Sequence, residues 1–156
     1  MLHYTADELM AYSNVRQNMS GPGALDLDAG DRFPANDTVI SLLEDRLILR
    51  RRPTPDDLRP GPLWAGPSIL KLVDHSAWLL TIANLPPGSD AFTIDLYIKF
   101  LRPAPYDDLL SDTRLLRISK RKADLDILIT SPEVPEGPVV HATATFSPRP
   151  ATATAG

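Results

Sequence analysis

The sequence predicts an α+β fold in which an antiparallel sheet wraps around one long central helix. One observation is the stretch 68–83, where ten of sixteen residues are apolar and occur all the way round a helix. A helix that is apolar on every side has to be buried. The other observation is that four strand patterns follow it in succession, and consecutive strands joined by short turns pair antiparallel. The sheet is therefore expected to cover the helix.

Length and composition limit the possible functions. The 156 residues fit one domain with its own core, and the absence of cysteine excludes disulfides, thiolate metal sites and a thiol nucleophile. His3, His75 and His141 lack metal-ligand spacing, and a formal net charge of -4 does not support nucleic-acid binding. The chain shows no signal-peptide pattern and no apolar run of the roughly 18 residues that span a membrane. We expect a cytoplasmic protein with no metal, no nucleic-acid partner and no membrane partner.

Sixteen prolines divide the chain into blocks, and helices and strands are expected between them. A Thr-x-x-Glu capping box opens 5–15 and predicts a short helix there. The block 35–52 splits at Glu44-Asp45 into two short apolar runs, which is typical of a hairpin. The long apolar helix over 68–83 follows.

The block 88–102 is the clearest strand, because apolar residues alternate strictly with polar ones in it. The apolar set is Phe92, Ile94, Leu96, Ile98 and Phe100, and the opposite set is Thr93, Asp95, Tyr97 and Lys99. The block 106–131 can hold two strands with a turn near 119–121, and 139–147 is rich in strand-forming residues. This order of elements is the α+β architecture called the hot dog fold. We expect residues 1–36 to form an N-terminal helix and connecting segment, 37–147 the hot dog domain, and 148–156 a flexible tail.

Asp74 lies near the middle of the apolar helix. A buried carboxylate without a partner is costly, so two interpretations are open. Asp74 forms an ion pair with Lys71, three residues earlier, or it is retained for chemistry. His75 points about 100° away from Asp74 around the helix and is expected to pack, as is His141 in its strand.

Three segments together resemble the PaaI-like (phenylacetate-degradation type) hot dog acyl-CoA thioesterases. They are 65–67 followed by 72–75, 92–104 with its Phe-Leu-Arg-Pro-Ala ending, and 141–146. The resemblance covers about 37–147. It implies an acyl-CoA thioesterase that hydrolyses a CoA thioester by carboxylate-assisted water attack, with no cofactor besides the CoA of the substrate. The alternative is a non-catalytic acyl-CoA or lipid-binding hot dog module.

The resemblance also implies roles for catalytic residues. Asp74 matches the carboxylate that acts as general base or nucleophile, Gly66 the glycine whose N–H polarises the thioester carbonyl, and Thr93 a hydroxyl residue that orients the attacking water. Two positions depart from the family pattern. Ala65-Gly66-Pro67 replaces His-Gly-Gly, and Arg59 stands where an amide side chain often helps to hold the carbonyl oxygen.

Further residues are candidates for binding the substrate or a second subunit. Trp78 and Tyr97 are bulky and either narrow an acyl pocket or pack in the core. The cluster Lys120-Arg121-Lys122 at a predicted turn is preferred over 50–52 as the receptor for CoA phosphates. The strand 91–102 would leave an unpaired edge in a monomer, so we expect self-association as a homodimer or dimer of dimers.

Overall fold

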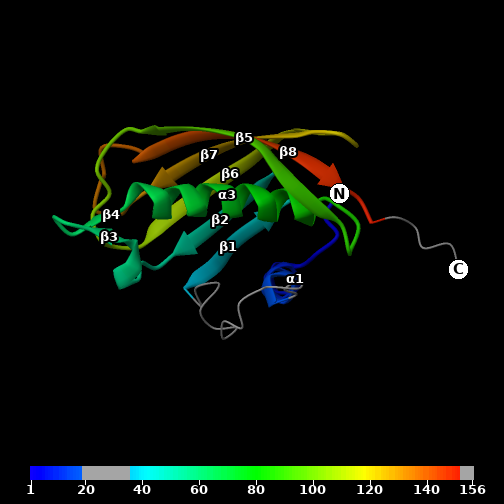
Figure 1. The fold of residues 1–156 in the computed structure, drawn as a ribbon, viewed down its shortest axis with the longest axis horizontal. Coiled ribbons are helices and arrows are strands. Elements are labelled where there is room, and N and C mark those ends of the chain that lie inside the picture. The colour runs from blue at the N-terminus through cyan, green and yellow to red at the C-terminus, as the bar shows by residue number, and fades with distance from the viewer. Residues whose placement is uncertain (19–35, 152–156) are drawn as a thin grey trace, which may run out of the picture.

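The computed structural model describes residues 1–18 and 36–151 of the chain (Figure 1). Six strands form one antiparallel sheet in the order β1-β2-β6-β7-β8-β5, and β3 and β4 pair separately. The strands are β1 Asp37–Leu43, β2 Arg46–Arg51, β3 Leu58–Arg59, β4 Leu63–Trp64, β5 Asp90–Phe100, β6 Leu109–Ile118, β7 Ala123–Thr130 and β8 Val140–Arg149. The helices are α1 Ala6–Asn18, the short 3-10 helix Pro55–Asp57 and α3 Gly66–Ala83.

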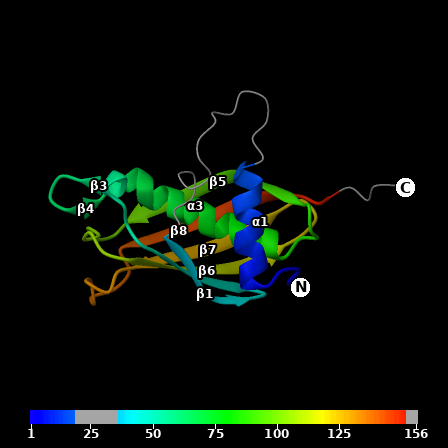
Figure 2. The ribbon, with the colours of Figure 1, turned by 90° about the horizontal axis from the view of Figure 1, so that it is seen from below.

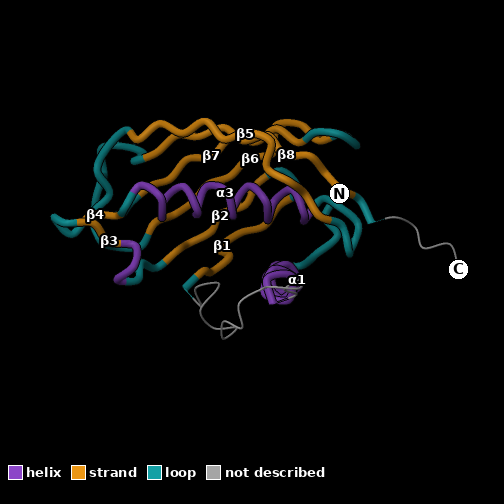
Figure 3. Tube along the Cα trace, in the orientation of Figure 1, coloured by secondary structure: helices purple, strands orange, loops and turns teal. Residues whose placement is uncertain are grey.

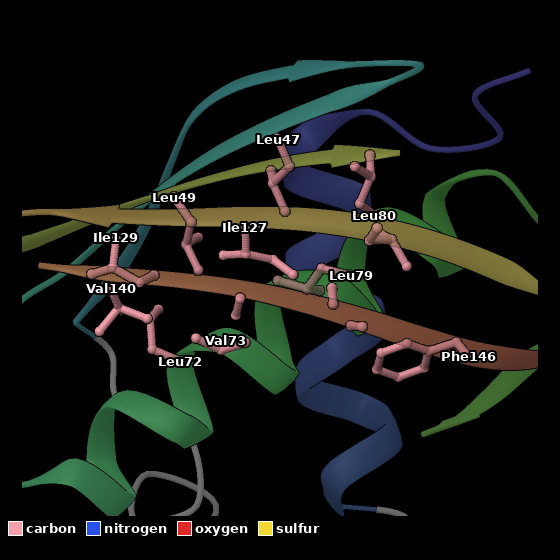
Figure 4. Packing of buried hydrophobic residues seen from close by; sticks show 14 of the residues in the cluster. Leu47, Leu49, Leu72, Val73, Leu79, Leu80, Ile127, Ile129, Val140 and Phe146 are labelled. Atoms are coloured by element: carbon pink, nitrogen blue, oxygen red, sulfur yellow. The ribbon is translucent and has the colours of Figure 1, made fainter. Parts of the chain in front are cut away.

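Helix α3 lies against one face of the six-stranded sheet, between its edge strands β5 and β1 (Figures 1 and 3). The predicted hot dog fold is therefore confirmed. Apolar side chains of α3 pack against the strands at the middle of the sheet, as Figure 4 shows. The labelled ones are Leu72, Val73, Leu79 and Leu80 of the helix and Leu47, Leu49, Ile127, Ile129, Val140 and Phe146 of the sheet. Each of these ten side chains is at most 1% exposed, so this layer is the core.

The N-terminal helix α1 starts where the capping box predicted. The Thr5 N–H donates to Glu8 Oε2 at 2.8 Å and the Glu8 N–H donates to Thr5 Oγ1 at 3.2 Å. Leu9 is fully buried in the common core. Helix α1 lies beside the C-terminal part of α3, as Figure 2 shows.

Helix α3 is buried on most of its surface but not all round, which differs from the prediction. Twelve of its eighteen residues are buried. The others at the helix surface are spaced three or four residues apart and so form one stripe, which is less covered by the chain. The stripe consists of Pro67, Leu70, Lys71, Asp74 and Trp78.

Strand β5 does not alternate strictly, because a β-bulge at Ile94 interrupts the pairing with β8. Thr93 pairs with Phe146 and Asp95 with Thr145, so Ile94 has no partner. A bulge residue shifts the phase of the side chains that follow it. Thr93 therefore lies on the same face as the buried Phe146 and points toward α3, while Phe92 lies on the opposite face.

The two ends of the predicted hot dog domain need one correction. Strand β8 runs to Arg149, and Pro148 is buried and pairs with Ala91 of β5. Proline fits there because the pairing of β8 with β7 already ends at Phe146, so no ladder bond on that side is lost. The strand thus extends two residues into the predicted tail. Residues 19–35 of the connecting segment and 152–156 of the tail lie outside the described residues.

The described residues lack two features that would have pointed to other functions. They include no helix that is both long and apolar enough to cross a membrane. They also contain no group of three or more His, Cys, Asp or Glu side chains arranged to hold a metal ion.

Candidate active site

Asp74 and Thr93 are brought together by the contact between α3 and β5. The Thr93 hydroxyl donates to Asp74 Oδ1 at 2.7 Å, across nineteen positions of sequence. The bulge at Ile94 makes this contact possible, because strict alternation through 92–100 would place Thr93 opposite to Leu96 and Ile98 on the sheet. A carboxylate that accepts a hydroxyl hydrogen bond is fixed in orientation and keeps its second oxygen available.

Asp74 is half-buried on the exposed stripe of α3. Lys71 is exposed, and among the ion pairs of the described residues none joins it to Asp74. The ion-pair interpretation of Asp74 is therefore wrong. A carboxylate beside a hydroxyl at the surface of a buried helix is an arrangement that can hold and deprotonate a water molecule.

His75, the next residue, packs inside the molecule as expected. Its ring stacks on Trp78 with centroids 6.1 Å apart, and Nε2 lies 3.8 Å from Asp37 Oδ2. Burial, and then the nearby charge of Arg51, lowers the pKa of His75 from 6.5 to about 3. His75 is therefore neutral at physiological pH and contacts a buried ion pair, in which Arg51 Nη2 lies 2.6 Å from Asp37 Oδ2.

Gly66 lies at the first turn of α3, at the edge of a pocket of about 380 Å³. Its N–H is one of the first-turn groups that have no acceptor within a helix. Pro67 has no N–H, and Ser68 and Ile69 both donate to the Ala65 carbonyl oxygen, at 3.1 and 3.2 Å. Gly66 thus supplies the amide of this turn that can bind a ligand oxygen in the pocket.

Arg59 borders the same pocket as Gly66, so the structure brings these two predicted residues together. Arg59 lies on β3, which pairs with β4 directly before the helix. The hairpin is fixed from the other side, because the Trp64 N–H donates to the Ala104 carbonyl at 2.9 Å and Trp64 Nε1 donates to the Asp107 carbonyl at 2.9 Å. The pocket is therefore held by two segments that are far apart in sequence.

The pair Asp74–Thr93 and the pocket at Gly66 do not form one site within a single chain. Gly66 and Asp74 are eight residues apart, which is roughly 12 Å along a helix axis. The N–H groups of a helix point toward its N-terminus, so the Gly66 N–H points away from Asp74. A general base and a carbonyl-binding donor must both lie about 3 Å from the reacting groups. The chain thus carries two half-sites.

Trp78 and Tyr97 lie in different environments. Trp78 is half-buried one helical turn after Asp74, and its Nε1 donates to Asp90 Oδ1 at 3.2 Å. Tyr97 is 63% exposed and pairs with the exposed Thr143, so it lies on the face of β5 that points away from α3. The structure brings Trp78 but not Tyr97 to the Asp74 half-site.

The two basic clusters differ in how their charges are paired. Arg51 forms the buried pair with Asp37, and Arg50 and Arg52 lie 3.9 and 3.6 Å from oxygens of Asp108. The turn residues Lys120, Arg121 and Lys122 are exposed, and within the described part of the chain they form one ion pair, a contact of 3.5 Å between Lys122 and Asp124. The second cluster therefore has more free charge.

Of the pocket residues that the sequence did not indicate, Phe100 and Arg102 matter most for its shape and charge. The Phe100 ring lies 3.5 Å from the position of a Cβ built on Gly66, and Arg102 lines the pocket wall. Both belong to the Phe-Leu-Arg-Pro-Ala segment, whose resemblance to the family implies no role for either residue. The signal was the position of this segment directly after the strand that carries Thr93.

Comparisons with known proteins show which family and which solved structures the chain resembles. Residues 63–137 match the family model described as the thioesterase superfamily. No curated protein matches the chain.

Solved structures similar to the chain carry the same fold. A candidate thioesterase from a Silicibacter species is 28% identical, with a TM-score of 0.79 over 96% of this chain and 95% of that one. A thioesterase from Haemophilus influenzae is 15% identical, with a TM-score of 0.73 over 99% and 100%. A hypothetical thioesterase from Streptococcus pneumoniae, solved with coenzyme A, is 18% identical, with a TM-score of 0.65 over 75% and 93%. Residues 63–137 are thus similar to the thioesterase superfamily, and the chain has the hot dog fold of these solved structures.

Proposed function

We propose that the protein is an acyl-CoA thioesterase of the PaaI-like type, in which Asp74 activates the attacking water. The observation that carries this proposal is the 2.7 Å hydrogen bond from Thr93 to Asp74 on the open stripe of α3. The bond leaves Asp74 Oδ2 for a water molecule. The thioesterase match over 63–137 and the coenzyme A held by a structural relative support the class of reaction and of substrate.

The reaction follows from these groups. Water attacks the thioester carbonyl carbon while Asp74 takes its proton, and the carbonyl electrons move onto the oxygen, which the Gly66 N–H stabilises. Collapse of this intermediate re-forms the carbonyl and breaks the C–S bond. The proton on Asp74 passes to the departing sulfur. The products are a carboxylic acid and the free thiol of CoA, and the carboxylate of Asp74 is regenerated.

A complete site requires two copies of the chain, since Asp74 and Gly66 belong to separate half-sites. Strand β5 is an edge of the sheet, and large apolar side chains on it and directly after it are 46% to 63% exposed. They are Phe92, Ile94, Tyr97, Phe100 and Leu101. Two β5 strands that pair antiparallel across a two-fold axis bring the Thr93 end of one against the Phe100 end of the other. Because Phe100 lines the same pocket as Gly66, this pairing would unite the half-sites in a homodimer.

The turn 119–122 is our candidate receptor for the CoA phosphates. Thr93 pairs with Phe146, Phe146 with Ala123, and Ala123 with Ile118. These residues lie side by side across the sheet, and the turn 119–122 directly follows Ile118 and precedes Ala123. Two to three strand spacings correspond to roughly 10–15 Å. The pantetheine arm has about thirteen bonds from sulfur to phosphorus and reaches roughly 15 Å at backbone-like dimensions. The distances thus agree.

The alternative function is a module that binds acyl-CoA or lipid without hydrolysis. Ala65-Gly66-Pro67 favours it to some extent, because the pocket has one amide donor fewer than His-Gly-Gly would provide. Thiol release from aliphatic and aromatic acyl-CoAs, measured beside the binding of a thioether analogue, separates the two functions. We expect turnover of at least one thioester class. Tight analogue binding with no thiol release from any ester would establish the module instead.

A further inference from the structure

Two arginines from separate segments border the pocket at the start of α3. Arg59 comes from the hairpin before the helix, and Arg102 follows β5. The apolar part of the wall is made by Leu63, Ile69 and Phe100. The pocket therefore combines a lining for methylene groups with two permanent positive charges.

Neither arginine of this pocket is neutralised by a carboxylate. Among the described residues, the arginines at 46, 50, 51 and 52 each have an Asp oxygen within 4.0 Å, whereas Arg59 and Arg102 have none. Four of the ten arginines whose side chains the structure describes thus have acidic partners, and six do not. The two at the pocket face it with their charge uncompensated.

Arg102 is also held in place. Its Nη1 donates to the Pro138 carbonyl oxygen at 2.8 Å, and its guanidinium lies against Gly137, where an added Cβ would be only 3.3 Å from Nη1. One nitrogen is used for this contact, and the remaining N–H groups can donate to a ligand. A guanidinium that is fixed by backbone loses less entropy when it binds a carboxylate in the two-bond geometry that Arg favours.

We propose that this pocket binds the distal carboxylate of a short dicarboxylic acyl group, an inference that rests on the thioesterase function proposed above. The thioester carbonyl lies at Gly66, and a sphere with the pocket's volume of 380 Å³ is about 9 Å across. At roughly 3.8 Å for every three backbone-like bonds, the phosphates of CoA lie about 15 Å from the sulfur. They therefore fall outside the pocket. The anion that fits inside is one on the acyl group itself.

The pocket also sets the length of that acyl group. By the same dimensions, the two carboxyl carbons of a glutaryl or adipyl group are roughly 5 to 6 Å apart. This span fits between Gly66 and the arginine side of the pocket, with the methylenes against Ile69 and Phe100. The expected substrates are CoA thioesters of dicarboxylic acids with five or six carbons.

The test compares adipyl-CoA with hexanoyl-CoA, which has the same chain length and no distal charge. We expect kcat/KM for adipyl-CoA to exceed that for hexanoyl-CoA by tenfold to a hundredfold, the range of a hydrogen bond to a charged group. Arg102→Gln should lower kcat/KM for adipyl-CoA far more than kcat/KM for hexanoyl-CoA, and so remove most of this preference. Arg117→Gln, an exposed arginine on β6 that makes the same change in net charge, is the matched control and should keep the preference.

Pantetheine thioesters, which lack the nucleotide phosphates, identify the source of the anion. If Arg102→Gln lowers kcat/KM for adipyl-pantetheine as much as for adipyl-CoA, the acyl carboxylate is the ligand. If Arg102→Gln lowers kcat/KM for hexanoyl-CoA but not for hexanoyl-pantetheine, the pocket binds a phosphate and the proposal is wrong. Equal rates for adipyl-CoA and hexanoyl-CoA in the wild type would overturn it too.

A binding experiment keeps this inference separate from the proposed reaction. Calorimetry with S-(5-carboxypentyl)-CoA and S-hexyl-CoA, two thioethers that cannot be hydrolysed, measures the subsite without turnover. Tighter binding of the carboxylated thioether, lost in Arg102→Gln, supports the subsite even if no thioester is hydrolysed. Equal affinity of the two thioethers contradicts the subsite even if the protein proves to be a thioesterase.

Discussion

Replacing Gly66 by proline removes the amide that is proposed to bind the thioester oxygen, with little change to the fold. Proline is well accepted at the first position of a helix, where its missing N–H is not used. The residue before a proline favours an extended conformation, and Ala65 already has φ -72° and ψ 138°. A Cβ at position 66 meets nothing closer than the Phe100 ring at 3.5 Å, which is ordinary contact. The variant is therefore expected to fold.

The expected loss in kcat for Gly66→Pro is roughly 10²- to 10³-fold, the effect of removing one oxyanion donor. Gly66→Ala adds the same Cβ but keeps the N–H, so it should retain most activity. The assay is steady-state thiol release, with melting temperatures for both variants. Equal rates for the proline and alanine variants would show that the Gly66 amide does not contact the reacting oxygen.

A heterodimer of a Gly66→Pro subunit and an Asp74→Asn subunit tests whether the site is shared between two copies. A heterodimer with one variant in each subunit has one site with both defects and one site with neither. Two affinity tags allow this heterodimer to be purified after co-expression, and it should show about half the wild-type turnover per dimer, as two-fold symmetry requires. A site contained within one chain would leave the heterodimer as slow as the two parent variants.

Three further predictions concern the neighbourhood of the site. Thr93→Val should lower kcat about tenfold or more at unchanged melting temperature, since it removes the hydrogen bond to the Asp74 carboxylate. The control Thr145→Val removes a 3.1 Å hydrogen bond to Asp124 on the outer face of the sheet and should leave kcat unchanged. The double variant Arg121→Ala, Lys122→Ala should raise KM for acyl-CoA severalfold at low salt and leave kcat unchanged. The rise in KM should disappear at high salt, and the kinetics of pantetheine thioesters should not change. Because burial and then the charge of Arg51 lower the pKa of His75 to about 3, only the unfolded state binds its proton between pH 6.5 and 3. Unfolding free energy should therefore fall as the pH decreases through that range, with a slope that His75→Leu reduces by about one proton.

The fold could be predicted because its signals are local. The capping box at Thr5, the block boundaries set by proline, and the apolar pattern of 68–83 each specify one element without reference to the rest of the chain. The bulge at Ile94 could not be predicted in this way. It depends on the register between β5 and β8, which the alternation within one strand does not contain.

The candidate site was only partly predictable for the same reason. Asp74, Gly66 and Thr93 follow from a resemblance of motifs, but their separation into two half-sites follows from the geometry of one helix. The role of Arg102 depends on a contact with Pro138, thirty-six residues away, and on Arg59 from another hairpin. Such tertiary contacts leave no spacing pattern in the sequence.

The most direct test of the central claim is the rate of thiol release by Asp74→Asn. The amide has nearly the same shape as the carboxylate and still accepts the Thr93 hydrogen bond through its oxygen, but it cannot take a proton from water. With an unchanged melting temperature and unchanged affinity for a thioether analogue, the account predicts a loss in kcat on the order of 10²- to 10⁴-fold. A folded Asp74→Asn variant that hydrolyses acyl-CoA at a rate near that of the wild type would contradict the assignment of Asp74 as the general base.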